Sequence, residues 1–425
     1  MNGSSGLSRR GFLAGAGALV AGAGLAGCEN TTTPVPTAEG SGGEGIMGDP
    51  TAGGPVDAAG IPLARRDYPV TLPKIGDPPK AGEPERGGEL QVYNYADYLN
   101  PEILQEFGKR EGVSVRVTTF NSLDEAFTKL STGRFQFDVI FTAPDHLPRL
   151  VGRRLIRPLN FDLIPNLTKE AWPELHSPFY DVGPRYSIPY TLYTTGIGWR
   201  NDQLGDFDPG ELGWESLWQS QRFRGRVGVL DDSREGLGMA LMRRGVTNLN
   251  TEDPELLRQA AEDLKELNDI ARVKVTINGY ETLPTARMWL HQVWSGDMLN
   301  AVISYLPEGT SGDVLSYWYQ TTGGPVFNDC ICMGVDATKP IMAHRFMNYL
   351  LDPEVALNNF VGYVGYQPPI TKIDANALFE QQLLPENLRN CVVTREDYAN
   401  GNAYLQLTAE GRRLWDQSWG EFRNG

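Results

Sequence analysis

The chain has 425 residues, of which 53 are Asp or Glu and 38 are Lys or Arg, so its formal net charge at pH 7 is −15. This balance excludes general nucleic-acid binding, which needs a basic surface. Four cysteines are too few for a disulfide-rich scaffold. The four histidines are scattered without metal-ligand spacing, so no metal site is expected.

The first segment, residues 1–27, has the features of an export signal. Arg9 and Arg10 precede a short apolar stretch rich in Ala and Gly, which ends in Leu-Ala-Gly-Cys at residues 25–28. Paired arginines indicate the twin-arginine route, and the last four residues resemble a bacterial lipobox in which Cys28 carries the lipid. The alternative is a single membrane anchor, for which the stretch is short. We expect a lipoprotein on the outer face of the cytoplasmic membrane, either periplasmic or at the cell surface.

Residues 28–87 are expected to form a tether and a Pro-rich extension. Up to about residue 60 the composition is rich in Gly, Thr, Pro and Ala, which favours a disordered linker. The rest of the extension carries Tyr68, Val70 and Leu72 and could lie extended on the folded body. The sequence leaves its order open.

Three cysteines remain beside Cys28: Cys330, Cys332 and Cys391. Export makes one disulfide possible, and the odd number leaves at least one thiol outside it. Cys330 and Cys332 are two apart in an apolar strand, so they face the same side and are poor partners for each other. A pairing of Cys332 with Cys391 stays open.

From about Gly88 onward, strands and helices alternate, which predicts a parallel sheet with helices on both faces. In chain order we expect a strand at 89–95, a helix at 100–112, a strand at 113–120, a helix at 123–133, a strand at 137–144, a long β-rich run at 186–200, a further unit at 216–245, a helix at 253–269 and two helices at 340–364 split at Asp352-Pro353. About 340 residues are too many for one core, so two α/β lobes are expected.

The ends of the expected strands share aromatic rings beside carboxylates. They lie at residues 95–98, 142–145, 231–232 and 327–329. In open parallel sheets, ligands bind beyond the carboxyl ends of the strands. We therefore look for a binding site among these side chains.

Asp232 and Glu235 have two interpretations. Asp232 is a good N-cap for a helix, and Glu235 at N3 could reach back to it as in a capping box. Two carboxylates at a strand-to-helix turn would also suit a cation, and the same residues could do both jobs, because negative charge is favourable at a helix N-terminus.

Six blocks of the chain, in one collinear order, resemble the bacterial polyamine-binding proteins, the spermidine/putrescine receptors of ABC importers. The blocks are residues 90–122, 137–160, 186–200, 223–245, 323–335 and 350–369. The resemblance implies the type II periplasmic-binding fold, an α/β fold whose two lobes hinge around a ligand cleft. It implies a first lobe of residues 88–198 plus 328–375 and a second of 199–327 plus 376–425.

The resemblance also implies a ligand site made of rings and acids. The ring positions are Tyr95 and Phe327, which are usually Trp, together with Tyr98 and Tyr366; the acids are Asp97, Asp232, Glu235 and the central Asp329. Three departures affect the site. Asp145 follows the third strand, where the family often has Tyr, and could be either a further acid of the site or a solvated turn residue. A Trp of the second lobe is expected to be replaced by Ser304 or Tyr305. Gln406 is a candidate for a C-terminal Gln.

The physical chemistry of a polyamine fits such a site. Each ammonium needs carboxylate acceptors and can rest on a ring face, and the methylenes need flat apolar walls. Some of these residues have structural alternatives: Tyr98, Phe327 and Tyr366 could be core aromatics, and Asp97 could cap a helix. Asp329, inside an apolar strand, must face a partner or a cleft.

The expected function is that of a monomeric solute-binding protein that captures a putrescine- or spermidine-like cation and delivers it to a membrane permease. The same fold could bind another amine, an amino acid, a sugar or a metal. An exported enzyme is the remaining alternative. The sequence has no GxSxG, HExxH or Gly-rich phosphate motif, so neither catalysis nor a cofactor is expected.

Overall fold

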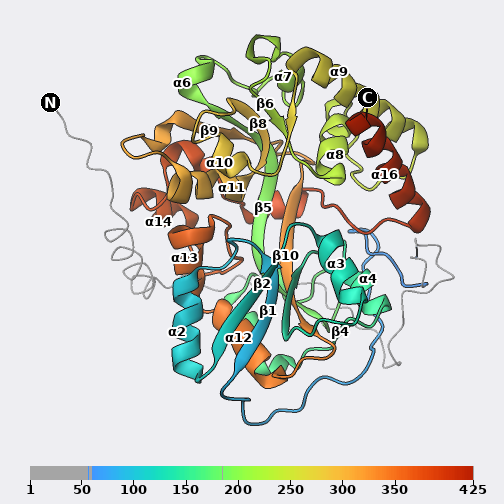
Figure 1. The fold of residues 1–425 in the computed structure, drawn as a ribbon, viewed down its shortest axis with the longest axis vertical. Helices are drawn as coiled ribbons and strands as arrows, with labels where there is room; N and C mark the ends of the chain where they lie inside the picture. The colour runs from blue at the N-terminus through green and yellow to red at the C-terminus, as the bar shows by residue number, and fades with distance from the viewer. Residues whose placement is uncertain (1–55, 57–59, 184, 425) are drawn as a thin grey trace, which may run out of the picture.

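The computed structural model describes residue 56 and residues 60–183 and 185–424, and they form two lobes joined by two long strands (Figure 1). The joining strands are β5 (Ser187–Arg200) and β10 (Val326–Gly334). The export signal, the two arginines and Cys28 lie outside the described residues. The α/β class and the two-lobed arrangement expected from the sequence are confirmed.

The first lobe, at the bottom of Figure 1, contains the first four strands. Its elements are β1 (Glu89–Tyr95), β2 (Ser114–Phe120), β3 (Val139–Thr142), β4 (Ile156–Arg157), α2 (Pro101–Glu111), α3 (Leu123–Ser131), α4 (Leu147–Gly152), α5 (Asn166–Glu170) and α12 (Pro340–Leu350). β1 is parallel to both β2 and β3. Its side chains alternate between two cores: Leu90 and Val92 face one, and Tyr93 faces the other.

The second lobe, at the top of Figure 1, contains most of the remaining elements. They are β6 (Val227–Val229), β7 (Lys274–Val275), β8 (Leu290–Trp294), β9 (Leu315–Trp318), α6 (Asn201–Leu204), α7 (Glu215–Trp218), α8 (Ser233–Arg243), α9 (Pro254–Ala271), α10 (Gly279–Thr282), α11 (Ser295–Asn300) and α16 (Ala409–Asn424). α13 (Pro353–Asn359) lies between two cores: its Ala356 joins the core of the first lobe, and its Leu357 shares a core with α11 and α14 (Ala375–Glu380). α15 (Arg395–Asn400) contacts β10.

β5 belongs to both halves of the sheet, whose order is β2-β1-β3-β10-β5-β8-β6-β7. Its residues up to Thr194 pair antiparallel with β10, and those from Thr195 pair antiparallel with β8. A single strand therefore passes from one lobe to the other at this point. Side chains around Thr194 and Thr195 lie where the lobes meet.

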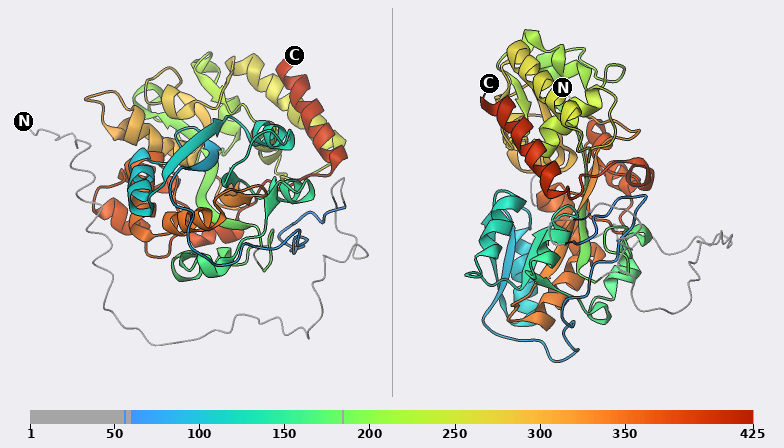
Figure 2. Two further views of the ribbon diagram at one scale, coloured as in Figure 1. Left: turned by 60° about the horizontal axis from the view of Figure 1, so that its bottom comes forward. Right: turned by 90° about the vertical axis from the view of Figure 1, so that its right-hand side faces the viewer.

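Residues 60–87, called the strap below, are ordered and pack on the first lobe. Figure 2 shows them as a blue coil that follows this lobe from the level where the lobes meet to its lower end. Val70 and Leu72 are each 1% exposed and join the same core as Tyr93. The Val70 N–H donates to the Phe179 carbonyl at 2.9 Å. The question that the sequence left open is thus answered in favour of an extended, packed segment.

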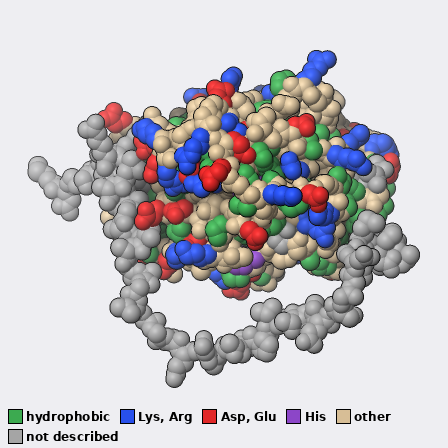
Figure 3. Space-filling view, turned by 90° about the horizontal axis from the view of Figure 1, so that it is seen from below, with side chains coloured by type: hydrophobic (Ala, Val, Ile, Leu, Met, Phe, Trp, Pro, Cys, Tyr) green, Lys and Arg blue, Asp and Glu red, His purple; other side chains and the backbone are tan. Residues whose placement is uncertain are grey.

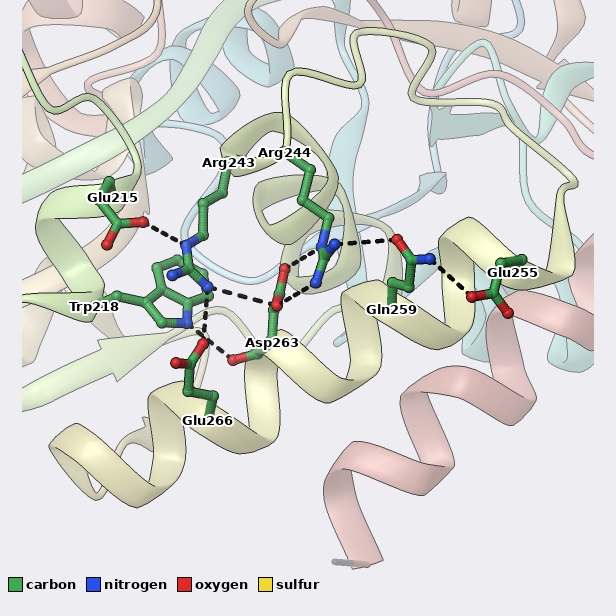
Figure 4. Close-up of polar contacts among 8 residues, drawn as sticks. All are labelled: Glu215, Trp218, Arg243, Arg244, Glu255, Gln259, Asp263 and Glu266. Carbon is green, nitrogen blue, oxygen red and sulfur yellow. Dashed lines mark hydrogen bonds and ion pairs between the residues drawn. The ribbon is translucent and has the colours of Figure 1, made fainter.

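Two arginines at the end of α8 fix this helix against its neighbours (Figure 4). Arg244 forms a two-pronged ion pair with Asp263 of α9 at 2.5 and 2.7 Å, and Arg243 pairs with Glu215 of α7 at 2.6 Å. The Arg243 guanidinium also lies 4.2 Å from the centre of the Trp218 ring. The start of α8, where the predicted acids lie, is therefore held in a defined position.

Acidic and basic side chains are interspersed over the underside of the molecule in Figure 3. Cys330, Cys332 and Cys391 are buried and free, so Cys332 and Cys391 are not bonded to each other. Within the described part of the chain, no helix combines the length and apolar character needed to cross a membrane.

Candidate ligand cavity

A cavity of about 220 Å³ lies where β5 and β10 pass between the lobes. Six of the nine residues predicted as ligand contacts line it: Tyr95, Asp145, Asp232, Glu235, Phe327 and Asp329. Tyr95, Asp145 and Asp232 lie at or just after the ends of β1, β3 and β6. Glu235 lies in the first turn of α8, and Phe327 and Asp329 lie inside β10. This volume is below the range of about 300–1,000 Å³ that is typical of pockets for drug-sized ligands. The cavity therefore suits a smaller molecule.

Asp329 is the central acid of the cavity wall. It lies in the middle of β10, is 6% exposed, and accepts hydrogen bonds from the Tyr98 hydroxyl at 2.7 Å and the Tyr193 hydroxyl at 3.3 Å. Among the described residues, no Lys, Arg or His forms an ion pair with it. Burial raises the pKa of Asp329 to about 7, which the two hydroxyl donors only partly offset.

Glu235 is another buried acid of the cavity wall that forms no ion pair with the residues the structure describes. Its Oε1 accepts from the Trp294 indole N–H at 2.7 Å and from the Thr195 hydroxyl at 3.0 Å, and Oε2 accepts from the Tyr404 hydroxyl at 3.3 Å. Burial, followed by the nearby charge of Asp232, raises the pKa of Glu235 to about 8. An ammonium group in the cavity would relieve both effects.

Asp232 caps α8, as one interpretation of the sequence predicted. Its Oδ1 accepts from the backbone N–H groups of Arg234 at 2.8 Å and Glu235 at 3.1 Å. The full capping box was wrong, because the Glu235 side chain bonds to groups of the cavity wall and not to the backbone of Asp232. Asp232 keeps access to the cavity, yet desolvation by the surrounding protein raises its pKa. Asp232 forms no ion pair within the described part of the chain.

Aromatic rings surround the acids in a connected set. Phe327 stacks on Tyr404 with 4.8 Å between ring centres, and Tyr193 lies 5.3 Å from Phe327. Tyr98 and Tyr366, two of the predicted rings, stand behind this wall and pack edge to face at 5.0 Å. They do not line the cavity themselves. Tyr98 acts through its hydrogen bond to Asp329.

Two predicted acids differ from Asp329 and Glu235 in their surroundings. Asp97 is exposed, has a φ of 54°, lies outside the cavity lining and accepts from the Tyr363 hydroxyl at 3.1 Å. Asp145 lines the cavity but pairs with His146 at 3.0 Å. Burial alone would lower the pKa of His146, but Asp145 and Asp124 outweigh it and raise this pKa to about 9. Asp145 therefore already has a cationic partner.

The sequence interpretation missed Trp294, Tyr193 and Tyr404, all of which line the cavity. The expected loss of a Trp wall in the second lobe was wrong. Trp294 supplies an indole, and neither Ser304 nor Tyr305 lines the cavity. The signal was present, because Trp294 ends strand β8 directly before α11, the same strand-end position as the residues that were predicted.

Gln406 and Arg234 form no ion pair with Asp329 or Glu235. Gln406 is buried but does not line the cavity. Arg234 lines it, yet its guanidinium donates to the Leu405 and Leu249 carbonyls at 3.0 and 2.9 Å and to the Asn250 side chain. Arg234 is thus held by neutral oxygens and does not neutralise Glu235 or Asp329. No group of three or more His, Cys, Asp or Glu suited to a metal ion occurs among the residues that the structure describes.

Two lobes around a buried acidic cavity define the architecture of a solute receptor that closes on its ligand. The chain belongs to the bacterial extracellular solute-binding proteins, whose family pattern matches residues 102–385, more than half of the sequence. This family acts in solute binding and transport, not in catalysis.

Curated relatives and solved structures agree with this assignment. The chain is 27% identical over 282 residues to the spermidine/putrescine-binding periplasmic protein of Escherichia coli K12, covering 66% of this chain and 77% of the relative. It is 28% identical to the putrescine/agmatine-binding protein of Pseudomonas aeruginosa, covering 64% and 77%. The Tp0655 lipoprotein of Treponema pallidum has the same fold, with a TM-score of 0.68 at 20% identity over 79% of this chain and all of that chain.

Proposed function

We propose that this chain is the solute-binding subunit of an ABC importer and that it captures a polyamine between its two lobes. The cation would lie in the cavity with its amino groups on Asp329, Glu235 and Asp232 and its methylenes against the rings of Tyr95 and Phe327. The curated relatives support the ligand class, since their names specify spermidine, putrescine or agmatine. Tyr98 and Tyr366 support the wall from behind.

One observation carries the proposal: Asp329 and Glu235 are buried beside an open cavity without a cationic partner among the described residues. Burying a carboxylate without countercharge is unfavourable, and each such group in a folded protein requires an explanation. A diamine or polyamine supplies the missing charge at two or more points. A neutral sugar would leave the charge uncompensated, and an amino acid would bring a carboxylate of its own.

The test is a comparison of the full chain with its Asp329→Asn variant. Putrescine or spermidine is expected to raise the thermal midpoint of the wild-type chain by mass action. The variant is expected to bind at least about 30-fold more weakly by calorimetry, because removing one partner of a buried charged pair costs about 2–5 kcal/mol. Its midpoint without ligand should be unchanged or higher.

Asp97→Asn is the matched control, since Asp97 is an exposed acid outside the cavity. It should leave amine binding within a factor of two of the wild-type chain. A wild-type chain that responds to amino acids or sugars and to no amine would remove the polyamine from the proposal and leave the family assignment intact.

We further propose that the protein leaves the cytoplasm by the twin-arginine route and is anchored by a lipid on Cys28, as a monomer that delivers its ligand to a membrane permease. The lobe division given from the sequence, with residues 88–198 plus 328–375 in the first lobe, is retained as part of this proposal.

The proposed export route and lipid anchor can be tested by substitution. Cys28→Ala should move the exported protein from the membrane fraction to the soluble fraction. Substituting Arg9 and Arg10 together by Lys should keep the precursor inside the cell, and unchanged fractions in either case would contradict this route.

A further inference from the structure

The cavity continues past the edge of β10 to the second face of that strand. Phe327 and Asp329 point to one face, whereas Asn328, between them, points to the other. Asn328 also lines the cavity, together with Tyr180, which accepts from its side-chain amide at 2.7 Å. The cavity lining therefore includes Asp329 on one face of β10 and Asn328 with Tyr180 on the other, which is called the strap end below.

The strap supplies a cation to the cavity lining, Arg66. Arg66 lines the cavity, although it precedes the part of the chain that matches the solute-binding family. Its guanidinium donates to the Tyr398 carbonyl at 2.7 Å. It also lies 5.5 Å from the centre of the Phe179 ring and 5.3 Å from that of Tyr398, both within the range of a cation–π contact.

Arg66 thus occupies the kind of environment that a bound alkylammonium would need. Two aromatic rings and a carbonyl oxygen surround it, and no carboxylate among the described residues forms an ion pair with it. The strap is held in place independently, through Val70 on Phe179 and the buried Leu72. A second cation placed beside this guanidinium would meet like-charge repulsion without a local acid to offset it.

We propose that Arg66 limits the length of the amine that the cavity accepts, because its guanidinium takes the place of a further ammonium at the strap end. This inference rests on the proposed function and adds a specificity-determining residue to it. The site then favours a short diamine over a longer polyamine. Discrimination by an unfavourable charge against the wrong ligand is a general route to specificity.

The experiment measures Kd by calorimetry for putrescine and for spermidine on the full chain. The wild-type chain should bind putrescine more tightly. Arg66→Met, which keeps an apolar stem, and Arg66→Gln, which keeps a donor for the Tyr398 carbonyl, should each shift the ratio of the two Kd values toward spermidine by about tenfold, equivalent to about 1.4 kcal/mol. Arg66→Lys keeps the charge and should keep the wild-type ratio.

Arg65→Met is the matched control, because Arg65 is the neighbouring half-buried strap arginine and does not line the cavity. It should leave the ratio unchanged. A wild-type ratio in both Arg66→Met and Arg66→Gln would overturn the inference, as would an equal loss of both amines, which would mark Arg66 as structural. Tighter wild-type binding of ornithine that is lost in these variants would overturn it in favour of carboxylate recognition. If no amine binds the wild-type chain, the proposed function itself fails, and that result is distinct from an unchanged ratio.

Discussion

Asp232 has a structural role as a helix cap and an electrostatic role in the cavity. Two different substitutions at this position can separate the two roles. Its Oδ1 caps α8 through two backbone N–H groups, while the carboxylate as a whole faces the cavity. Asn caps helices about as well as Asp but carries no charge, whereas Ala does neither. The two tasks should therefore respond differently to the two substitutions.

We predict that Asp232→Asn keeps the free energy of unfolding within about 0.5 kcal/mol of the wild-type value, and that Asp232→Ala lowers it by about 1 kcal/mol. Both variants should weaken putrescine binding by about tenfold, because both remove the same charge, and tenfold corresponds to 1.4 kcal/mol. Urea denaturation and calorimetry measure the two effects separately. Asn-variant binding equal to that of the wild-type chain would show that Asp232 is a cap only.

At the scale of elements, the strap is the feature that links the N-terminal part of the chain to the folded body. Leu72 is 1% exposed in the core that also contains Tyr93 and Phe120. We predict that Leu72→Ala lowers the free energy of unfolding by about 2–5 kcal/mol, as for other buried Leu residues that leave a cavity. Thermal or urea denaturation of the full chain checks this value.

Lys74→Ala provides the comparison two residues away. Lys74 is half exposed and pairs at 3.0 Å with the exposed Asp77, and such surface pairs contribute about 0–1 kcal/mol. Its loss should be close to neutral. Equal, small effects of both substitutions would mean that the strap does not belong to the cooperative fold.

Local sequence patterns predicted the helices and strands well. Contacts between segments distant in the sequence were harder to predict. The expected helix at 253–269 corresponds to α9, and the split at Asp352-Pro353 falls between α12 and α13. These follow from helix periodicity and caps, which are local. The insertion of β10 between β3 and β5 is not local, and neither is the packing of the strap on the first lobe.

The difference between local patterns and long-range contacts also explains which residues of the cavity could be predicted from the sequence. Asp329 and Glu235 could be predicted, because an acid in an apolar strand and an acid at a strand-to-helix turn are visible in the sequence. The shortage of cations beside them, the His146 partner of Asp145 and the exposure of Asp97 depend on which segments meet in space. Arg66 could not be assigned to the cavity from a Pro-rich segment without knowing its path.

At the scale of the whole molecule, the buried acids make the unliganded protein and its complex respond differently to pH. The pKa of Asp329 is raised to about 7 and that of Glu235 to about 8, above the unfolded values near 4. Stability from a carboxyl with a raised pKa is complete below its unfolded pKa, falls as the pH rises from the unfolded to the folded pKa, and is gone above the folded pKa. The pKa of His146, raised to about 9, gives a loss in the same direction.

We predict that the unliganded protein loses thermal stability from about pH 4 upward, with the contributions of Asp329 and Glu235 lost by about pH 8 and that of His146 by about pH 9. Putrescine should remove the part of this loss that comes from Asp329 and Glu235. An ammonium beside Asp329 and Glu235 favours their ionised forms, so binding releases protons, and the affinity rises as the pH passes through 7 and 8. Calorimetry at pH 7 in buffers of different ionisation enthalpy measures this release. Glu235→Gln should reduce this proton release, while Asp97→Asn should not.

An affinity that stays constant from pH 6 to pH 9 would mean that the ligand does not contact Asp329 and Glu235, because a cation that neutralises these carboxylates cannot bind equally well when they are protonated.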